Sequence, residues 1–327
     1  MKGKHRVEVK FSNLHYVLEL KRKYTIILGD TGSGKTSLYS LLVEKLRLNS
    51  RLVKIHSDVN IGLGNNLYDV KEHGNDYGVM FLEEGNYLTS KEMDTFTRSS
   101  SSYFVIFSRY PLKNLSYSIN EIYVIDEVYS GKKRRKYLKP YYDLSSSLTF
   151  RPDIIVTEDK KSGNIFFSKT QTKDTQVLSA CGKDNVLTFV RKLMSDKDNI
   201  LVVADGAACG GNSDEFQSLI DYASMYNKKL AIFTPESFEF ILLSSSIFDD
   251  ADIRDKLERT YLYADSLEFL TWERYYTWLI KQLIRENGYL DIGMGYKKSK
   301  LPKYFIINSD CVYDVIRKLI PTERKFL

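Results

Sequence analysis

The sequence predicts an α/β fold in which two sheet-forming regions follow one another along the chain. Short apolar runs of strand length alternate with segments whose apolar residues recur at helical spacing, which is typical of βα repeats. A basic run and prolines interrupt this alternation near residues 130–150, after which it resumes. We therefore expect one domain over residues 1–145 and a second over residues 150–327, the second ending in a mostly helical tail.

Composition and charge predict a soluble, cytoplasmic protein. The chain of 327 residues is 43% hydrophobic, which is enough for two cores. It lacks a run of about 18 apolar residues that would span a membrane, and its first residues lack the apolar stretch of a signal peptide. The three cysteines are isolated, which fits a reducing compartment. The net charge of +6 is weak evidence for a polyanionic partner.

The first domain is expected to open with an antiparallel hairpin over residues 6–20, where apolar and polar residues alternate around a short polar turn. Apolar runs then predict buried strands in a mainly parallel sheet, with helices or irregular connections between them. These strands are expected at residues 24–28, 51–57, 78–84, 103–109 and 121–127.

A glycine-rich segment, residues 29–36, lies between a predicted strand and a predicted helix and matches GxxxxGK[ST] in full. Backbone N–H groups of such a loop close around phosphates, its lysine reaches the β- and γ-phosphates, and its last hydroxyl binds Mg²⁺. We therefore expect ATP, or alternatively GTP, to bind here with Mg²⁺. The expected nucleotide-binding residues are Gly29, Asp30, Thr31, Gly32, Ser33, Gly34, Lys35, Thr36 and Ser37.

Two further strands bring polar residues to the same edge of the predicted sheet. The apolar run 79–82 ends in Glu83 and Glu84, as in a Walker B segment. Glu83 would complete the magnesium shell with Thr36, and Glu84 would orient the attacking water. The next strand ends in Ser108 and Arg109, where a polar group can sense the γ-phosphate. The alternative for the two glutamates is a buried strand with a solvated acidic end.

The most concentrated positive charge lies at residues 132–136, followed closely by Tyr137, Tyr141 and Tyr142. Cations beside aromatic rings can bind nucleic acid through phosphate contacts and base stacking. The alternative is a solvated loop between the two domains. The sequence leaves both interpretations open.

The second domain is expected to begin with another hairpin, over residues 153–170, and to continue as a βαβαβ series. All four histidines precede residue 74, so a metal here would be held by carboxylates, which favours Mg²⁺ or Mn²⁺ over zinc. Acids at the carboxyl ends of parallel strands can hold one or two ions that polarise a phosphodiester. Such acids are Glu158, Asp184, Asp205, Glu236 and Glu239. The alternatives are acids that merely face solvent, and a Glu239 that caps the following helix.

The first 130 residues resemble the ATPases of the ABC and related AAA-type groups. The resemblance rests on the opening hairpin that leads into YTIILGDTGSGKTSL, on FLEEG, and on VIFSR. It implies ATP hydrolysis, with Lys35 and Glu84 in catalytic roles. Ser108 and Arg109 stand where those ATPases usually have Thr-His, and no LSGGQ-like segment occurs, so we expect slow hydrolysis or a nucleotide-driven switch.

Residues 150–245 resemble the Toprim domain of topoisomerases, primases and the OLD-type nucleases, which join an ABC-like ATPase to a Toprim domain in this order. The matching residues are Glu158, 182–185, Asp205, and Glu236 or Glu239. The resemblance implies cleavage of DNA or RNA with Mg²⁺ or Mn²⁺. It implies catalytic roles for Glu158 and Asp205, and metal ligation by Glu158, Asp205 and Glu236.

Three functions fit these observations. The leading hypothesis is an ATP-binding protein and slow ATPase, able to form a homo-oligomer, that controls a Toprim-like domain acting on nucleic acid. The alternative is a nucleotide-dependent switch or scaffold with a catalytically degenerate Toprim-like domain. Asp205-Gly206-Ala207 favours this alternative, because a Toprim domain has Asp-x-Asp there. The third is a P-loop kinase, which leaves half of the chain unexplained.

Overall fold

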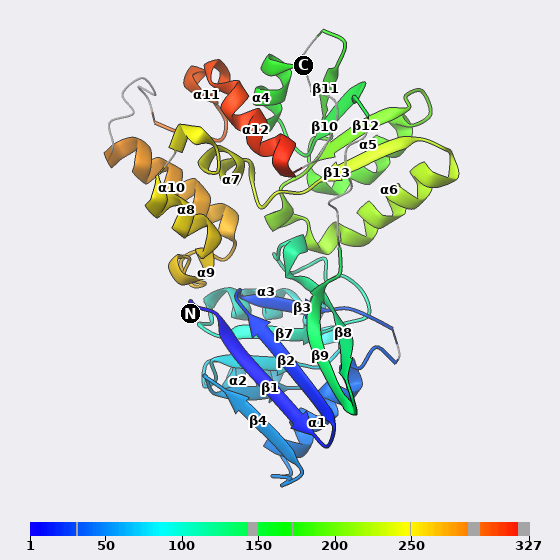
Figure 1. The fold of residues 1–327 in the computed structure, drawn as a ribbon, viewed down its shortest axis with the longest axis vertical. Helices are drawn as coiled ribbons and strands as arrows, with labels where there is room; N and C mark the ends of the chain where they lie inside the picture. The colour runs from blue at the N-terminus through cyan, green and yellow to red at the C-terminus, as the bar shows by residue number, and fades with distance from the viewer. Residues whose placement is uncertain (31, 143–149, 172, 249, 287–294, 320–327) are drawn as a thin grey trace. The chain divides into compact units, whose positions relative to one another are not determined.

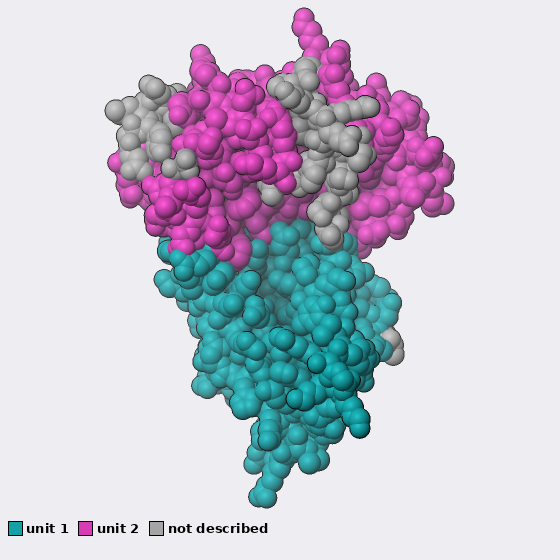
Figure 2. Space-filling model, in the orientation of Figure 1, with its two compact units in different colours: residues 1–142, 259–271 teal, residues 143–258, 272–327 magenta. Residues whose placement is uncertain are grey.

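The computed structural model describes residues 1–30, 32–142, 150–171, 173–248, 250–286 and 295–319 (Figure 1). The chain divides into two compact units (Figure 2). Unit 1 comprises Met1–Tyr142 and Arg259–Thr271, and unit 2 comprises Asp143–Glu258 and Trp272–Leu327. The sequence alone predicts Arg259–Thr271 within the second domain. This segment instead belongs to unit 1, where the Gly3 N–H donates to the Tyr261 carbonyl at 2.6 Å.

Unit 1 is built on a nine-stranded sheet in the order β4-β1-β2-β9-β8-β3-β7-β6-β5. The pairs β4–β1, β1–β2 and β9–β8 are antiparallel, and the other neighbouring pairs are parallel. The strands are β1 (His5–Phe11), β2 (Leu14–Leu20), β3 (Tyr24–Ile27), β4 (Val53–Ser57), β5 (Ile61–Gly64), β6 (Val79–Leu82), β7 (Tyr103–Phe107), β8 (Ile122–Ser130) and β9 (Lys133–Pro140). The helices are α1 (Lys35–Leu46), α2 (Leu67–His73), α3 (Lys91–Ser99) and α9 (Thr260–Tyr263), with short 3₁₀ turns η1 (Asn86–Thr89) and η2 (Ile119–Glu121).

The centre and the edges of this sheet differ as their sequences do. Strands β3, β6 and β7 are apolar and buried along their whole length, as expected for parallel strands covered on both faces. A strand forms at β4, as predicted, but it is a half-exposed edge strand beside β1 and not a buried strand. Strand β5 was not predicted, since its two glycines weaken the apolar pattern. A Cβ on Gly62 would lie 2.3 Å from the Tyr77 ring, so only glycine fits there.

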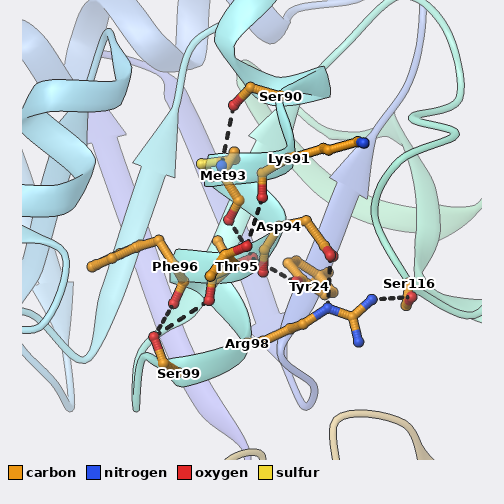
Figure 3. Close-up of polar contacts among 11 residues, drawn as sticks. Tyr24, Ser90, Lys91, Met93, Asp94, Thr95, Phe96, Arg98, Ser99 and Ser116 are labelled. Atoms are coloured by element: carbon orange, nitrogen blue, oxygen red, sulfur yellow. Dashed lines mark hydrogen bonds and ion pairs between the residues drawn. The ribbon is translucent and has the colours of Figure 1, made fainter.

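Helix α3 packs beside β3 and begins with a side-chain cap (Figure 3). The Ser90 hydroxyl accepts a hydrogen bond from the Met93 N–H at 3.1 Å, which satisfies one of the open donors of the first turn. Further along the helix, the buried Thr97 hydroxyl accepts from the Tyr24 hydroxyl at 2.7 Å. The Tyr24–Thr97 hydrogen bond ties the start of β3 to α3, and the other end of β3 leads into the glycine-rich segment.

Residues 133–136 of the basic run lie in strand β9, and only Lys132 is in the turn before it, so the interpretation of the run as a solvated loop is wrong for all but Lys132. Strands β8 and β9 form an antiparallel hairpin, and β9 also pairs in parallel with β2. Because side chains alternate along a strand, Lys133 and Arg135 are exposed on one face while Arg134 and Lys136 are half-buried on the other. The positive charge of the run is therefore divided between two faces of the sheet.

Unit 2 contains a four-stranded sheet in the order β11-β10-β12-β13, with all neighbouring pairs parallel. Its strands are β10 (Ile154–Thr157), β11 (Gln176–Ser179), β12 (Asn199–Val203) and β13 (Lys229–Phe233). Its helices are α4 (Ser162–Thr170), α5 (Val186–Leu193), α6 (Ser213–Met225), α7 (Phe238–Leu243), α8 (Ala251–Glu258), α10 (Trp272–Glu286), α11 (Lys303–Ile307) and α12 (Ser309–Leu319). Short 3₁₀ turns lie at η3 (Lys183–Asn185), η4 (Gly206–Ala208), η5 (Gly210–Asn212) and η6 (Ser246–Phe248).

The hairpin predicted over residues 153–170 is wrong. Only its first half is a strand, β10, and its second half is helix α4, whose first turn is closed by the Ile165 N–H donating to the Lys161 carbonyl at 3.0 Å. Phe166 and Phe167 are completely buried on this helix. Aromatic and β-branched residues favoured a strand by propensity, and burial against the sheet overrode that preference.

The α/β class predicted from the sequence is confirmed, with one large mixed sheet, a second parallel sheet and helices around both (Figure 1). The described residues after Ile253 (254–286 and 295–319) are mostly helical, as expected. Among the described residues, no helix has both the length and the apolar character needed to cross a membrane.

Candidate functional sites

The glycine-rich segment, residues 29–36, connects the end of β3 to the start of α1, and we call it the phosphate loop. Gly29 and Gly34 have φ values of 144° and 92°, a region that side chains other than glycine rarely adopt. Gly34 is the N-cap of α1 and supplies no side-chain cap, and the first turn of α1 carries no acid. The N–H groups of that turn are therefore available to an anion. Thr31 lies outside the described residues.

Lys35 is the cation of the phosphate loop, and its side chain lies over the loop itself. It is 8% exposed, and its Nζ donates to the Ser33 hydroxyl at 3.5 Å. Burial lowers the pKa of Lys35, while the carboxylates of Glu84 and Asp30 oppose that change. A net lowering means that these two carboxylates do not compensate the buried charge in full. An anionic ligand would complete that compensation.

The two acids after β6 face different surroundings. The charge of Glu84 acts on Lys35, whereas that of Glu83 acts on Tyr39 and Tyr87. Glu83 directly follows β6, whereas Glu84 lies in the bend after it, and this bend separates the two carboxylates. The structure thus brings Glu84 to the phosphate loop and places Glu83, the predicted magnesium ligand, in the neighbourhood of Tyr39.

Ser108 and Arg109, the two residues after β7, also make different contacts. The buried Ser108 hydroxyl donates to the Tyr110 carbonyl at 2.7 Å, so it serves a local turn. Arg109 contacts the Glu84 carboxylate through both its side chain and its backbone. Its Nε lies 3.2 Å from Glu84 Oε2, and its backbone N–H donates to Glu84 Oε1 at 3.3 Å. The described part of this site is therefore Lys35, Glu84 and Arg109 around the phosphate loop.

These residues fit a nucleotide-bound magnesium ion. Thr36 is exposed at the start of α1, and Asp30 is exposed in the loop. Mg²⁺ in such sites takes only one or two protein ligands and completes its shell with phosphate oxygens and water. The Thr36 hydroxyl, exposed at the start of α1, is a ligand of this kind.

In unit 2, Glu158 and Asp205 follow the neighbouring strands β10 and β12, and the structure brings them together. Burial and the charge of the nearby Asp159 raise the pKa of Glu158. The Asp205 N–H donates to the Glu158 carboxylate and lowers this pKa, but by less than burial and Asp159 raise it. The buried Cys209 thiol also approaches Glu158 Oε2, at 3.8 Å. Both acids line a cleft at the carboxyl edge of the sheet, together with Lys161, Asn164, Glu239 and Lys298.

Glu239, which the sequence placed among the strand-end acids, joins two residues that the sequence did not assign to this edge, Glu273 and Lys298. We call Glu158, Asp205, Glu239 and Glu273 with Lys298 the carboxylate cluster. Burial and the charges of Glu273 and Glu239 raise the pKa of Asp205. Lys298 Nζ donates to Glu273 and lies 3.7 Å from Glu239. Burial alone would lower the pKa of Lys298. The charges of Glu239 and Glu273 outweigh this effect, so the pKa of Lys298 is raised.

The remaining predicted acids are placed differently. Glu239 does not cap α7, because the Ser237 hydroxyl does so, and Glu239 instead accepts from the Tyr296 hydroxyl at 2.8 Å. The Glu236 side chain is buried and is not part of the cleft lining. Asp184 accepts from the Asn212 amide at 3.3 Å.

The backbone after Asp205 leaves little room for a second acid. A Cβ on Gly206 would lie 2.6 Å from the Thr234 carbonyl oxygen, and Ala207, where a second aspartate would stand, is completely buried. Over the described ranges, no three His, Cys, Asp or Glu residues have a metal-binding arrangement. Since Lys298 supplies the positive charge of the cluster, these residues do not fit a two-metal centre.

Comparison with protein-family models, with curated proteins and with solved structures found no match to this chain.

Proposed function

We propose that unit 1 binds ATP, or alternatively GTP, with Mg²⁺ at the phosphate loop and hydrolyses it slowly. The observation that carries this proposal is the uncapped N-terminus of α1 behind a full GxxxxGK[ST] loop, with an incompletely compensated Lys35 over it. In this proposal the first-turn N–H groups and Lys35 bind the phosphates. The Thr36 hydroxyl would hold Mg²⁺, which neutralises charge between the phosphates.

In this proposal Glu84 orients the attacking water, because it is the acid after β6 whose charge acts on Lys35. In the structure its carboxylate is engaged by the Arg109 side chain and backbone. Glu84 must leave Arg109 to act on water, and this requirement supports slow hydrolysis. Arg109, once released, would lie close to the charge that develops on the γ-phosphate.

The experiment that tests the proposal is calorimetric titration of the protein with Mg·ATP and Mg·GTP. Lys35→Ala should weaken binding by about a hundredfold or more, because it removes a charge-assisted phosphate contact. Lys54→Ala, on the exposed side of the edge strand β4, has the same charge change and should bind as the wild type does. Unchanged affinity in Lys35→Ala would contradict the site, provided that thermal unfolding shows a folded variant.

For unit 2 we propose a Toprim-like module acting on nucleic acid under the control of the nucleotide. Support comes from Glu158 and Asp205 meeting in a cleft at the carboxyl ends of parallel strands. The test is incubation of labelled single- and double-stranded DNA and RNA with Mg²⁺ or Mn²⁺, with and without ATP. Cleavage by the wild type that is lost in Asp205→Ala would support a nuclease and identify its substrate.

The second candidate function is a nucleotide-dependent switch or scaffold whose unit 2 recognises a partner without cleaving it. It is favoured by Lys298, which compensates the carboxylates, and by the buried Ala207. Absence of cleavage under all conditions, together with measurable ATP binding, would select this function. A P-loop kinase is the least supported candidate. Phosphorylation of a metabolite by the purified protein would be the observation that supports it.

A further inference from the structure

Lys136, on the half-buried face of β9, approaches the phosphate loop. A Cβ built on Gly34 would lie 2.8 Å from Lys136 Nζ, so the ammonium group lies directly against the loop backbone. The same Nζ lies 5.6 Å from the centre of the Tyr16 ring, and the Tyr16 hydroxyl donates to the Gly34 carbonyl at 3.3 Å. Two side chains from the strands β2 and β9 therefore meet at the last glycine of the loop.

The charge of Lys136 is only loosely matched by protein groups in its surroundings. Glu127 Oε2 lies 3.7 Å from Lys136 Nζ, which is too long for a hydrogen bond, and the same oxygen accepts from Arg134 at 2.9 Å. The Lys136 side chain is only 12% exposed, so water screens its charge poorly. An anion at the loop would gain more from this ammonium group than from a solvated surface lysine.

Lys35 and Lys136 lie at different parts of the loop. A Cβ on Gly29 would lie 3.7 Å from Lys35 Nζ, whereas Lys136 is next to Gly34, where α1 begins. In loops of this pattern the lysine reaches the outer phosphates and the backbone cradles the inner ones. We propose that Lys136 is a second phosphate-binding cation, which contacts the inner phosphates of the nucleotide. This inference rests on the nucleotide site of the proposed function.

The same strand supplies a matched control. Lys133 is exposed, three residues before Lys136 and on the opposite face of β9, so its replacement changes the net charge equally without touching the loop. Lys136→Met removes the charge but keeps an apolar stem over Tyr16, and Lys136→Arg keeps the charge. Comparing the three variants separates a local phosphate contact from the general positive field of the hairpin.

The experiment is calorimetric titration of the full chain and these variants with Mg·ATP and Mg·ADP, with thermal unfolding as the check on folding. Lys136→Met should bind both nucleotides about tenfold more weakly than the wild type, because both carry the inner phosphates. Lys136→Arg should restore most of the affinity, and Lys133→Met should bind as the wild type does. If Lys136→Met melts well below the wild type, Lys136→Gln replaces it.

Wild-type affinity in Lys136→Met would overturn the inference, as would an equal loss in Lys133→Met. The Lys35→Ala variant shows whether only the proposed role of Lys136 is wrong or whether the nucleotide site itself is wrong. If Lys35→Ala loses binding while Lys136→Met retains it, the nucleotide site stands and only the role of Lys136 falls. If the wild type binds neither nucleotide, the site and the role of Lys136 fall together.

Discussion

Lys35 of unit 1 and Lys298 of unit 2 are both largely withdrawn from water, yet their pKa values move in opposite directions. Burial lowers the pKa of Lys35, and Glu84 and Asp30 offset this only in part. At Lys298, Glu239 and Glu273 outweigh the burial and raise the pKa. The phosphate loop therefore has positive charge left for an anionic ligand, whereas the carboxylate cluster already contains its own cation.

The two sites also differ in how their residues are supplied. The phosphate loop comes from one contiguous segment between β3 and α1. The carboxylate cluster combines the ends of β10 and β12 with residues of α7 and α10 and with Lys298 near the end of the chain. Substitutions that change one charge at a time therefore test each site separately.

The largest effect is expected on the rate of ATP hydrolysis when Glu84, one of the two acids after β6, is replaced. Glu84→Gln should lower the rate of ATP hydrolysis by about a hundredfold or more with little change in ATP affinity, because it removes a base near the phosphate loop. Glu83→Gln is the matched control, since its charge acts on Tyr39 and Tyr87 instead. Steady-state phosphate release checks both variants, and a greater loss in Glu83→Gln would reverse the assignment.

A smaller effect is expected from the cation of the carboxylate cluster. Lys298→Met should lower the free energy of unfolding of unit 2 by about 3 kcal/mol, because it leaves Glu239 and Glu273 without their positive partner. This is the lower end of the range for broken buried ion pairs, since the Lys298 side chain is 28% exposed. Chemical denaturation measures the change.

Lys297→Met, at the exposed neighbouring position, is the control for Lys298→Met. The uncompensated carboxylates should also attract a divalent cation, so Mn²⁺ should raise the melting temperature of Lys298→Met more than that of the wild type. Equal stability and an equal response to Mn²⁺ would show that Lys298 does not balance the cluster.

The sequence predicted those features that depend on local pattern. The α/β class, the opening hairpin, the strand-to-helix setting of the phosphate loop and the parallel sheet of unit 2 all follow from periodicity and turn residues. The hairpin predicted for residues 153–170 failed because the local preference of Phe166 and Phe167 for strands is weaker than their burial on α4.

Long-range charge pairing was beyond the reach of the sequence pattern. Glu273 lies in an aromatic helix and Lys298 follows a segment without periodicity, and neither carries a motif. The separation of Glu83 from Glu84 depends on the bend after β6, and the division of the basic run depends on the alternation of side chains along β9. That alternation could be applied only once the strand boundaries and the neighbours were known.

Lys23 is a third buried lysine, whose partner is a backbone carbonyl. It is 2% exposed, and its Nζ donates to the Ser100 carbonyl. Burial lowers its pKa from 10.5 to about 8, against the charge of Asp265. Between these values the unfolded chain keeps a proton that the folded chain has lost, so the free energy of unfolding should rise with pH.

From pH 7 to pH 9.5 this contribution should amount to about 2 kcal/mol. Lys23→Met has no titrating group at this position, so the difference in unfolding free energy between wild type and Lys23→Met should shift in favour of the wild type over that interval. Taking the difference cancels the tyrosines, whose raised pKa values affect both proteins alike. Denaturation at closely spaced pH values measures the shift. A difference independent of pH would mean that buried Lys23 keeps its proton, as Lys298 does.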